Sequence, residues 1–273
     1  MPDDKYKSIS GRKVFFINPT ISIENFVIGR LQTMEYEVYV LKDYRTAKSL
    51  FAEIQEGICF VCPDAGLSKT GWHNFIKYFE NNIVFKNFDF GIFSESIAEN
   101  KKAEITKDLK LTAGFFSMLE TEELVRELVK SLDKLSAKGM RKYVRVSCMD
   151  ATETELYWFT KQQKMFRAKL LDISNAGIAV KLNASLSKEV FVNQLISDAT
   201  LILAGKQVPV SVKVTGIKAT SDVLLVIMMY GMDTHVSAQN QIRAYVTEKL
   251  KSNLEAKIKN VPLDKTNYEN MEI

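Results

Sequence analysis

The sequence predicts two domains, an α/β domain with a parallel sheet followed by an antiparallel β-barrel. Residues 12–135 alternate short apolar runs with segments of helical periodicity, a pattern typical of parallel strands flanked by helices. The residues after 138 are rich in β-formers and show no strong helical period until residue 237. Between the two lies "SAKGM", residues 136–140, a small and flexible segment typical of a domain joint.

The first domain, residues 1–137, is expected to interleave five strands with five helices. The strands are predicted at 13–18, 36–41, 57–62, 88–94 and 113–118. The helices are predicted at 23–34, 45–55, 72–82, 96–109 and 121–135. This rhythm favours a doubly wound parallel sheet.

The second domain, residues 138–260, is expected to be a six-stranded antiparallel barrel closed off by a helix. Its strands are predicted at 141–148, 154–160, 166–174, 177–182, 201–217 and 222–231. The helix, 237–260, carries an apolar stripe formed by Ile242, Val246, Leu250, Leu254 and Ile258. Pro262 would stop it, and residues 261–273 are expected to be a disordered tail.

Composition narrows the class of protein. The chain has 273 residues, is 46% hydrophobic and carries a formal net charge of only +4, so its charge does not call for a nucleic-acid partner. The longest apolar run, "VLLVIMMYGM", is too short to span a bilayer, and the polar start does not look like a signal peptide. We therefore expect a cytoplasmic protein with no membrane span.

Metal and catalytic sites find little support in the sequence. Cys59 and Cys62 have the spacing of redox or zinc pairs, but they lie in a strand-like run, where residues three apart face opposite sides. Buried structural thiols are the favoured interpretation. His73 and His235 are the only histidines, and no nucleophile, base and orienting group can be placed together. We expect no enzyme, no metal and no cofactor.

The first domain resembles the receiver domain of two-component signalling in its strand count, helix count and length. That resemblance implies a magnesium ion on acids that end the first strand and a phosphorylated aspartate that ends the third. Here Asn18 and Pro19 end the first strand, so the oxygen ligands that Mg²⁺ prefers are missing. Asp64 lies one or two places beyond the expected phosphoacceptor.

Of the remaining receiver positions, Ser94 matches the small hydroxyl that ends the fourth strand, whereas Ser117 is the nearest polar side chain where a lysine is expected. We interpret the domain as a pseudo-receiver that serves as a docking or dimerisation platform. Phosphorylation of Asp64 is the minority alternative.

Two short patterns in the second domain carry a functional prediction. Arg141 and Arg145 stand four residues apart, and "DISNAG" follows with Asp172, Ser174 and Gly177. Arg-x-x-x-Arg, then about 25 to 30 residues, then Asp-x-Ser-x-x-Gly resembles the PilZ family, whose members bind the bacterial second messenger cyclic di-GMP. Each pattern alone suits an edge strand or a hairpin turn, but together on a predicted barrel they favour a ligand site.

The resemblance assigns cyclic di-GMP to Arg141, Arg145, Asp172, Ser174 and Gly177. Cyclic di-GMP is a dianion with two guanines, and a guanidinium can donate paired hydrogen bonds to guanine O6 and N7 or to phosphate. Both arginines are expected to project from one side of an extended arm. Asp172 would accept from a guanine edge, Ser174 would donate, and Gly177 would turn the chain with positive φ and allow close approach of the ligand.

Two function classes remain open. The first is a non-enzymatic cyclic di-GMP receptor that transmits occupancy to a protein partner by rearranging its domains. That partner could dock on the pseudo-receiver, through which the chain could also form a homodimer. The second is a ligand-independent adaptor or scaffold in motility or envelope assembly. Retention of both arginines favours the receptor.

Overall fold

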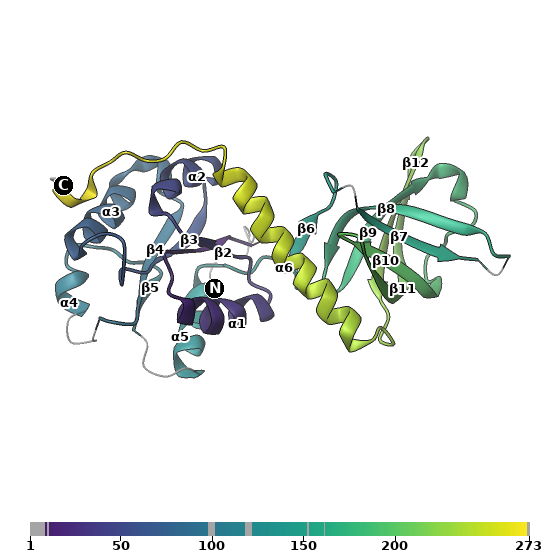
Figure 1. Cartoon of the computed structure of the whole chain (residues 1–273), viewed down its shortest axis with the longest axis horizontal. Coiled ribbons are helices and arrows are strands. Elements are labelled where there is room, and N and C mark those ends of the chain that lie inside the picture. Colours follow the sequence, from purple (N-terminus) through teal and green to yellow (C-terminus); the bar gives the residue numbers. More distant parts are fainter. Residues whose placement is uncertain are drawn as a thin grey trace, which may run out of the picture. The chain divides into compact units, whose positions relative to one another are not determined.

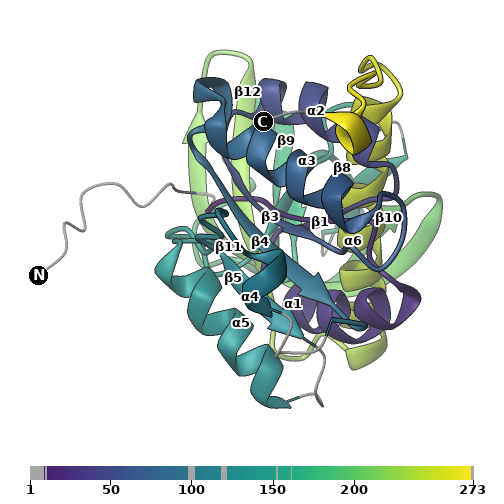
Figure 2. The same cartoon turned by 90° about the vertical axis from the view of Figure 1, so that its left-hand side faces the viewer.

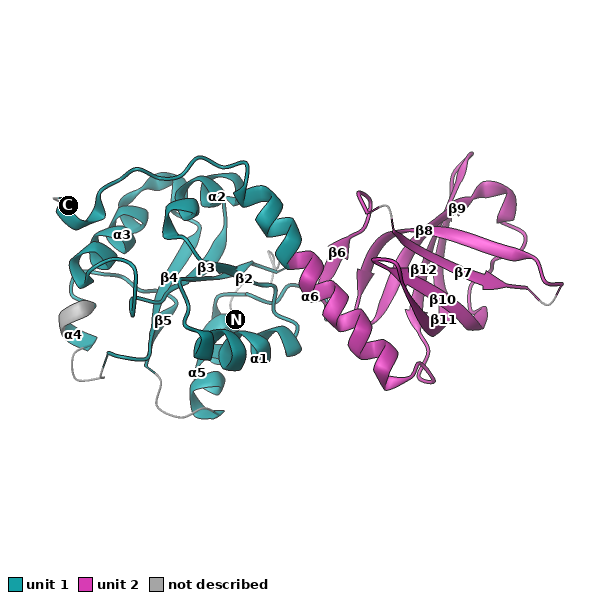
Figure 3. Ribbon diagram, in the orientation of Figure 1, with its two compact units in different colours: residues 1–142, 251–273 teal, residues 143–250 magenta. Residues whose placement is uncertain are grey.

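The structure is a computed structural model that describes residues 9, 11–97, 102–117, 122–151, 153–160 and 162–271. The chain forms two compact units, residues 1–142 with 251–273, and residues 143–250 (Figure 3). The boundary after Lys142 lies five residues beyond the predicted one. The last turns of the closing helix group with the first unit rather than the second.

The first unit is built on a five-stranded parallel sheet with strand order β2-β1-β3-β4-β5 (Figure 1). The strands are β1 Val14–Ile17, β2 Val38–Leu41, β3 Gly57–Val61, β4 Phe88–Ser94 and β5 Gly114–Ser117. Every neighbouring pair is parallel. This confirms the predicted sheet, and the order 2-1-3-4-5 is one of the two common doubly wound arrangements.

Helices cover both faces of this sheet (Figure 2). They are the π-helix Ile23–Ile28 running into α1 Gly29–Thr33, then α2 Ala47–Ile54, α3 Lys69–Asn81, α4 Lys102–Ile105 and α5 Glu122–Lys134. One core joins the sheet to α1 and α5, and a second, rich in phenylalanine, joins it to α2 and α3. Of the helix predicted at 96–109, residues 98–101 lie outside the described part and α4 is a single turn.

Cys59 and Cys62 belong to opposite cores, as the strand period predicts. Cys59 packs on the side of α2 and α3, Cys62 packs on the side of α1 and α5, and both are fully buried. Burial raises the pKa of both thiols well above the ordinary value. Both thiols are therefore structural, as predicted.

The second unit is a closed six-stranded antiparallel barrel with one short extra strand. Its strands are β7 Thr154–Phe159, β8 Met165–Ser174, β9 Gly177–Asn183, β10 Leu195–Leu203, β11 Lys206–Ala219 and β12 Val223–Tyr230. The order β8-β7-β10-β11-β12-β9 closes because β9 also pairs with β8. The extra strand, β6 Arg145–Ser147, pairs with β8 outside the closed ring.

Two strand predictions need correction, although six strands do close the barrel. The run 201–217 is a hairpin of β10 and β11 rather than one strand, because Ala204 and Gly205 adopt φ of 48° and 77° in a two-residue turn. The predicted strand 141–148 shrinks to Arg145–Ser147, preceded by bends at residues 142 and 143.

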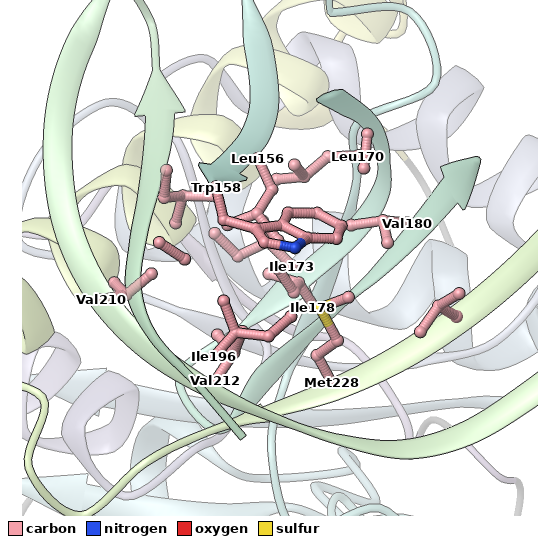
Figure 4. Close-up of a cluster of buried hydrophobic side chains, with 14 of the residues drawn as sticks. Leu156, Trp158, Leu170, Ile173, Ile178, Val180, Ile196, Val210, Val212 and Met228 are labelled. Carbon is pink, nitrogen blue, oxygen red and sulfur yellow. The ribbon is translucent and has the colours of Figure 1, made fainter. Parts of the chain in front are cut away.

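The barrel is filled by inward-facing aliphatic side chains around Trp158 (Figure 4). Trp158 is 3% exposed and stacks on Phe166 at 5.1 Å between ring centroids, so it packs the core as predicted. Helix α6, Val236–Ile258, carries the expected apolar stripe. Ile242 and Val246 belong to the barrel core, whereas Leu254 and Ile258 belong to the core of the first unit.

The predicted disorder of residues 261–273 is wrong for the described part. Residues 262–271, called the strap below, follow α6 and lie against α2 and α3 of the first unit. Tyr268, in the 3₁₀ turn Tyr268–Asn270, is 1% exposed. The strap is polar, but its polar groups find partners on the first unit, which the sequence alone did not reveal. Residues 272 and 273 lie outside the described part.

Candidate ligand-binding site

Four of the five predicted site residues come together on three neighbouring strands of the barrel. Arg145 opens β6, Asp172 and Ser174 end β8, and Gly177 opens β9. The pairing of β6 with β8 places Arg145 opposite Ser174 and Ser147 opposite Asp172. A register shift in β8 just before Asp172 interrupts its ladder with β9. The barrel therefore gathers the sequence patterns at one corner.

Arg145 and Asp172 form an ion pair across this corner. The Arg145 Nη1 lies 3.6 Å from Asp172 Oδ1, and the two side chains are 38% and 33% exposed. At this distance and exposure the pair contributes little stability, roughly 0 to 1 kcal/mol. Both groups therefore keep hydrogen-bonding capacity for a ligand, the guanidinium as donor and the carboxylate as acceptor.

Arg141 does not lie on the same strand as Arg145, which corrects the predicted extended arm. Residue 141 precedes the bends at 142 and 143, so strand alternation does not relate the two side chains. Arg141 is exposed, and its backbone N–H donates to the carbonyl of Ile9 at 3.2 Å. The boundary between the units, after Lys142, separates Arg141 from Arg145.

Ser174 builds the turn between β8 and β9. Its hydroxyl donates to the Gly177 carbonyl at 3.1 Å and accepts from the backbone N–H groups of Ala176 and Gly177 at 3.3 Å. The side chain is 4% exposed. This is a local side-chain-to-backbone turn, which the sequence pattern Asp-x-Ser-x-x-Gly favours physically. A direct contact of Ser174 with a ligand stays a prediction.

Gly177 is required by close packing rather than by a left-handed backbone. It is absent from the residues with positive φ, so the predicted positive-φ turn is wrong. A Cβ at this position would collide with the Met228 carbonyl oxygen and approach the Met229 Cα to 3.0 Å on β12. The neighbour that demands the glycine is thus the next strand of the barrel.

Gly177→Ala is expected to destabilise the barrel by about 1 to 3 kcal/mol, because the added methyl group meets backbone that cannot move aside without breaking the β9–β12 ladder. Gly216→Ala is the matched control: a Cβ there meets nothing closer than 3.6 Å, and that atom is the end of the Ile227 side chain. Chemical denaturation of the two variants checks this. Equal losses from both would contradict it.

Two residues of helix α6, Tyr245 and Lys249, act on Cys148, and the sequence patterns did not indicate this. Cys148 follows β6, and burial raises its pKa, whereas a hydrogen bond with Tyr245 and the charge of Lys249 act in the opposite direction. The charge of Asp172 also raises this pKa, so Asp172 and Lys249 act on the Cys148 thiol in opposite senses.

Asp64, the candidate phosphoacceptor of the first unit, is held by the loop after β4. Its Oδ1 accepts from the Ser94 hydroxyl at 2.7 Å, the Ser96 hydroxyl at 2.5 Å and the Ser96 N–H at 3.1 Å. Its Oδ2 accepts from the Glu95 N–H at 2.8 Å. Asn18, after β1, donates its amide to the Ala65 carbonyl at 2.8 Å. These hydrogen bonds join the loop after β3 to the loops after β4 and β1. The residue after β1 is the amide Asn18, where a receiver would have an acid.

These contacts make the folded first unit sensitive to acid. Burial alone would raise the pKa of Asp64, but the hydrogen bonds from Ser96, Ser94 and the Glu95 N–H lower it below its ordinary value of 3.8. A carboxyl with a lowered folded pKa stabilises the fold above its unfolded pKa. That stability is lost as pH falls through the folded pKa.

Asp64→Asn should therefore cost about 1 to 3 kcal/mol of unfolding free energy at pH 7, since hydrogen bonds to a charged acceptor are replaced by weaker ones. The difference between parent and variant should shrink as pH falls below 3.8. Glu95→Gln, an exposed acid in the same loop, should change the unfolding free energy little. Denaturation at a series of pH values measures this, and a pH-independent difference would contradict it.

Two features are absent from the residues that the structure describes. No three or more His, Cys, Asp or Glu side chains gather there in a cluster that could hold a metal ion. None of the described helices combines the length and the apolar character needed to cross a membrane.

Comparison with known proteins gives structural neighbours only. No protein-family model and no curated protein matches the sequence. Solved structures similar to parts of the chain include the following three.

The PilZ domain of Escherichia coli YcgR with c-di-GMP matches 44% of this chain and 98% of its own, at 14% identity and a TM-score of 0.39. The MrkH–c-di-GMP complex of K. pneumonia matches 44% of this chain at 18% identity and a TM-score of 0.39, and the chain spans about half of MrkH, 55%. The Vibrio cholerae chemotaxis protein CheY4 matches 46% of this chain and 99% of its own, at 21% identity and a TM-score of 0.36.

Proposed function

We propose that this chain is a non-enzymatic receptor for cyclic di-GMP. The observation that carries the proposal is the corner of the barrel where Arg145 and Asp172 lie 3.6 Å apart, partly exposed, beside the Ser174–Gly177 turn. A planar cation and a carboxylate side by side offer donors and acceptors together. Guanine presents the matching set, with acceptors at O6 and N7 and donors at N1 and N2.

The phosphates of the ligand would need further positive charge. Arg141 precedes Arg145 by four residues along the chain, and Lys249 of α6 acts electrostatically on Cys148, three residues after Arg145. In this proposal Arg145 and Asp172 bind a base, Arg141 and Lys249 neutralise the dianion, and Ser174 and Gly177 hold the turn in shape. No cofactor takes part.

Transmission of the signal follows from where the unit boundary lies. Arg141 belongs to the first unit and Arg145 to the second, with the boundary after Lys142. A ligand bound by both arginines would restrict residues 142–144 and so change how the two units are oriented. A preference of a few kcal/mol for one orientation is enough to shift the population decisively. A protein partner of the pseudo-receiver unit would sense that change.

The ligand-independent adaptor remains the second candidate, favoured by one observation. Asp172 already pairs with Arg145, and Ser174 already builds its turn, so each of these residues has a partner within the barrel. In an adaptor these residues would only hold β6 against β8.

Calorimetric titration of the full chain with cyclic di-GMP and with cyclic di-AMP distinguishes the receptor from the adaptor. The receptor should bind cyclic di-GMP saturably and cyclic di-AMP at least tenfold more weakly, because adenine carries a donor where guanine has O6. Scattering should show a change in the distance between the units upon binding, and residues 136–146 should become protected from proteolysis. Absence of binding to either nucleotide would favour the adaptor.

A further inference from the structure

The strap, residues 262–271, lies against α2 and α3 of the first unit, and the surface that it covers there is called the groove below. In Figure 1 it is the yellow end of the chain, which runs from α6 past α2 to α3. The Ser49 hydroxyl of α2 donates to the Pro262 carbonyl at 2.7 Å. The Asp264 N–H donates to the Arg45 carbonyl at 2.8 Å just before α2. These contacts hold the start of the strap by its backbone.

Tyr268 anchors the strap in an aromatic pocket. Its ring is 1% exposed and lies 5.1 Å from the ring centroid of Phe75 and 5.9 Å from that of Tyr78, both on α3. Tyr44 closes the other side at 6.3 Å. The Tyr268 hydroxyl donates to Asp264 Oδ2 at 2.6 Å, so the strap itself satisfies the buried phenol.

Glu269 sits at the start of α3. The Ser68 N–H donates to Glu269 Oε1 at 2.8 Å, and the Ser68 hydroxyl donates to Oε2. This carboxylate occupies the space beside Gly71, where a Cβ would lie 2.8 Å from Glu269 Cδ. A negative charge is favourable at this end of a helix. A side chain at position 71 would force the Glu269 carboxylate to shift.

Asn74 of α3 recognises the backbone of the strap. Its Nδ2 donates to the carbonyls of Tyr268 and Met271 at 2.8 and 3.0 Å, and the side chain is only 8% exposed. A buried amide loses both bonds if the strap leaves without replacement, which is costly. Asn74 therefore needs main-chain carbonyls laid against α3 to keep its amide paired.

We propose that the groove between α2 and α3 is a peptide-binding site. The strap occupies it as an intramolecular ligand, and the groove accepts the same kind of segment from another protein when the strap is displaced. Its ligand class is an acidic peptide with a Tyr-Glu pair and an aspartate four residues before the tyrosine. Three separate contacts support the peptide-binding site. An aromatic pocket holds the tyrosine ring, Ser68 holds the carboxylate, and the Asn74 amide holds main-chain carbonyls.

The tyrosine pocket selects the side chain, Ser68 and the N-terminus of α3 select the acid, and Asn74 reads backbone alone. Peptide grooves combine an anchor pocket with main-chain hydrogen bonds in the same way. Because the strap is tethered to α6, its effective concentration at the groove is high, and it competes strongly with any external segment. The proposal does not depend on cyclic di-GMP.

The test uses the full chain with Tyr268→Ser, which removes the anchor and frees the groove. The probe is a fluorescent synthetic peptide of residues 262–273, followed by anisotropy. It should bind the Tyr268→Ser chain saturably and the parent chain at least tenfold more weakly, because the parent strap competes. The same peptide with serine in place of its tyrosine should not bind. Asn74→Leu in the Tyr268→Ser chain should weaken binding at least tenfold.

Circular dichroism checks whether the Tyr268→Ser chain folds. If Tyr268→Ser unfolds the first unit, Tyr268→Leu replaces it, since leucine keeps an apolar side chain in the pocket but loses the ring contacts and the hydroxyl bond to Asp264. The same comparison of peptide binding then applies. Absence of saturable binding to a folded variant would overturn the proposal, and so would equal binding to parent and variant. The strap would then be a fixed part of the fold.

Discussion

Arg145→Ala is expected to weaken cyclic di-GMP binding by about 2 to 4 kcal/mol, roughly 30- to 1,000-fold in Kd. The guanidinium would form charge-assisted contacts, and its loss leaves ligand acceptors unpaired at a partly buried corner. Asp172 would also lose its ion-pair partner, which turns the site more negative towards a dianion. Calorimetry on the purified variant measures the change.

Arg167→Ala is the matched control for this prediction. Arg167 lies on β8 like Asp172 and is exposed. Its Nε lies 3.8 Å from Glu155 Oε1, so its ion-pair partner is not Asp172. The substitution removes one positive charge from the barrel, as Arg145→Ala does, and the free energy of cyclic di-GMP binding should weaken by less than about 1 kcal/mol. Arg145→Lys should lose most of the affinity, because lysine lacks the planar pair of donors. Equal effects of Arg145→Ala and Arg167→Ala would mean that only overall charge matters.

Trp158→Ala is expected to destabilise the barrel by about 3 to 5 kcal/mol, because a large side chain at the centre of the core leaves a cavity. Trp158 is 3% exposed and stacks on Phe166 within the core, so no base could reach its ring (Figure 4). The free energy of unfolding from denaturant titration gives the loss.

Trp158→Phe separates packing from ligand stacking. It should retain part of the stability and leave cyclic di-GMP affinity unchanged, since the phenyl ring still stacks on Phe166. A folded Trp158→Phe chain that bound the nucleotide tenfold more weakly would show that the indole touches the ligand.

Much of the fold could be predicted because its signals are local. Strands such as Gly57–Val61 are continuous apolar runs, and buried parallel strands have this composition. The alternation in β8 from Met165 to Leu170 likewise shows which side faces the barrel core. The hairpin at Ala204–Gly205 does not stand out in the sequence because β-forming residues continue on both sides of it, although Gly205, Lys206 and Gln207 interrupt the apolar residues.

Only part of the arrangement of the candidate residues was predictable. Asp172, Ser174 and Gly177 follow one another in one turn, so their proximity follows from the sequence. The place of Arg141 depends on bends at 142 and 143 that carry no glycine or proline signal. The influence of Lys249 on Cys148 depends on the packing of α6 on the barrel, a long-range contact that local patterns do not show.

The strap shows the limit of composition as a guide to order. "PLDKTNYENM" has few apolar residues and is typical of a disordered segment. Its polar groups are nevertheless satisfied by Asn74, Ser68 and Ser49, which lie about 200 residues earlier in the chain. A polar segment is ordered when another part of the chain supplies its partners, and that information is not local.

The most direct test of the receptor is a side-by-side calorimetric titration of the parent chain and the Arg141→Ala/Arg145→Ala double variant with cyclic di-GMP. The parent should bind saturably, and the folded double variant should show at least a 100-fold weaker Kd, because both guanidinium groups of the proposed site are gone. Equal affinity of the two chains, or no binding by the parent at millimolar nucleotide, would contradict the assignment of this corner to cyclic di-GMP.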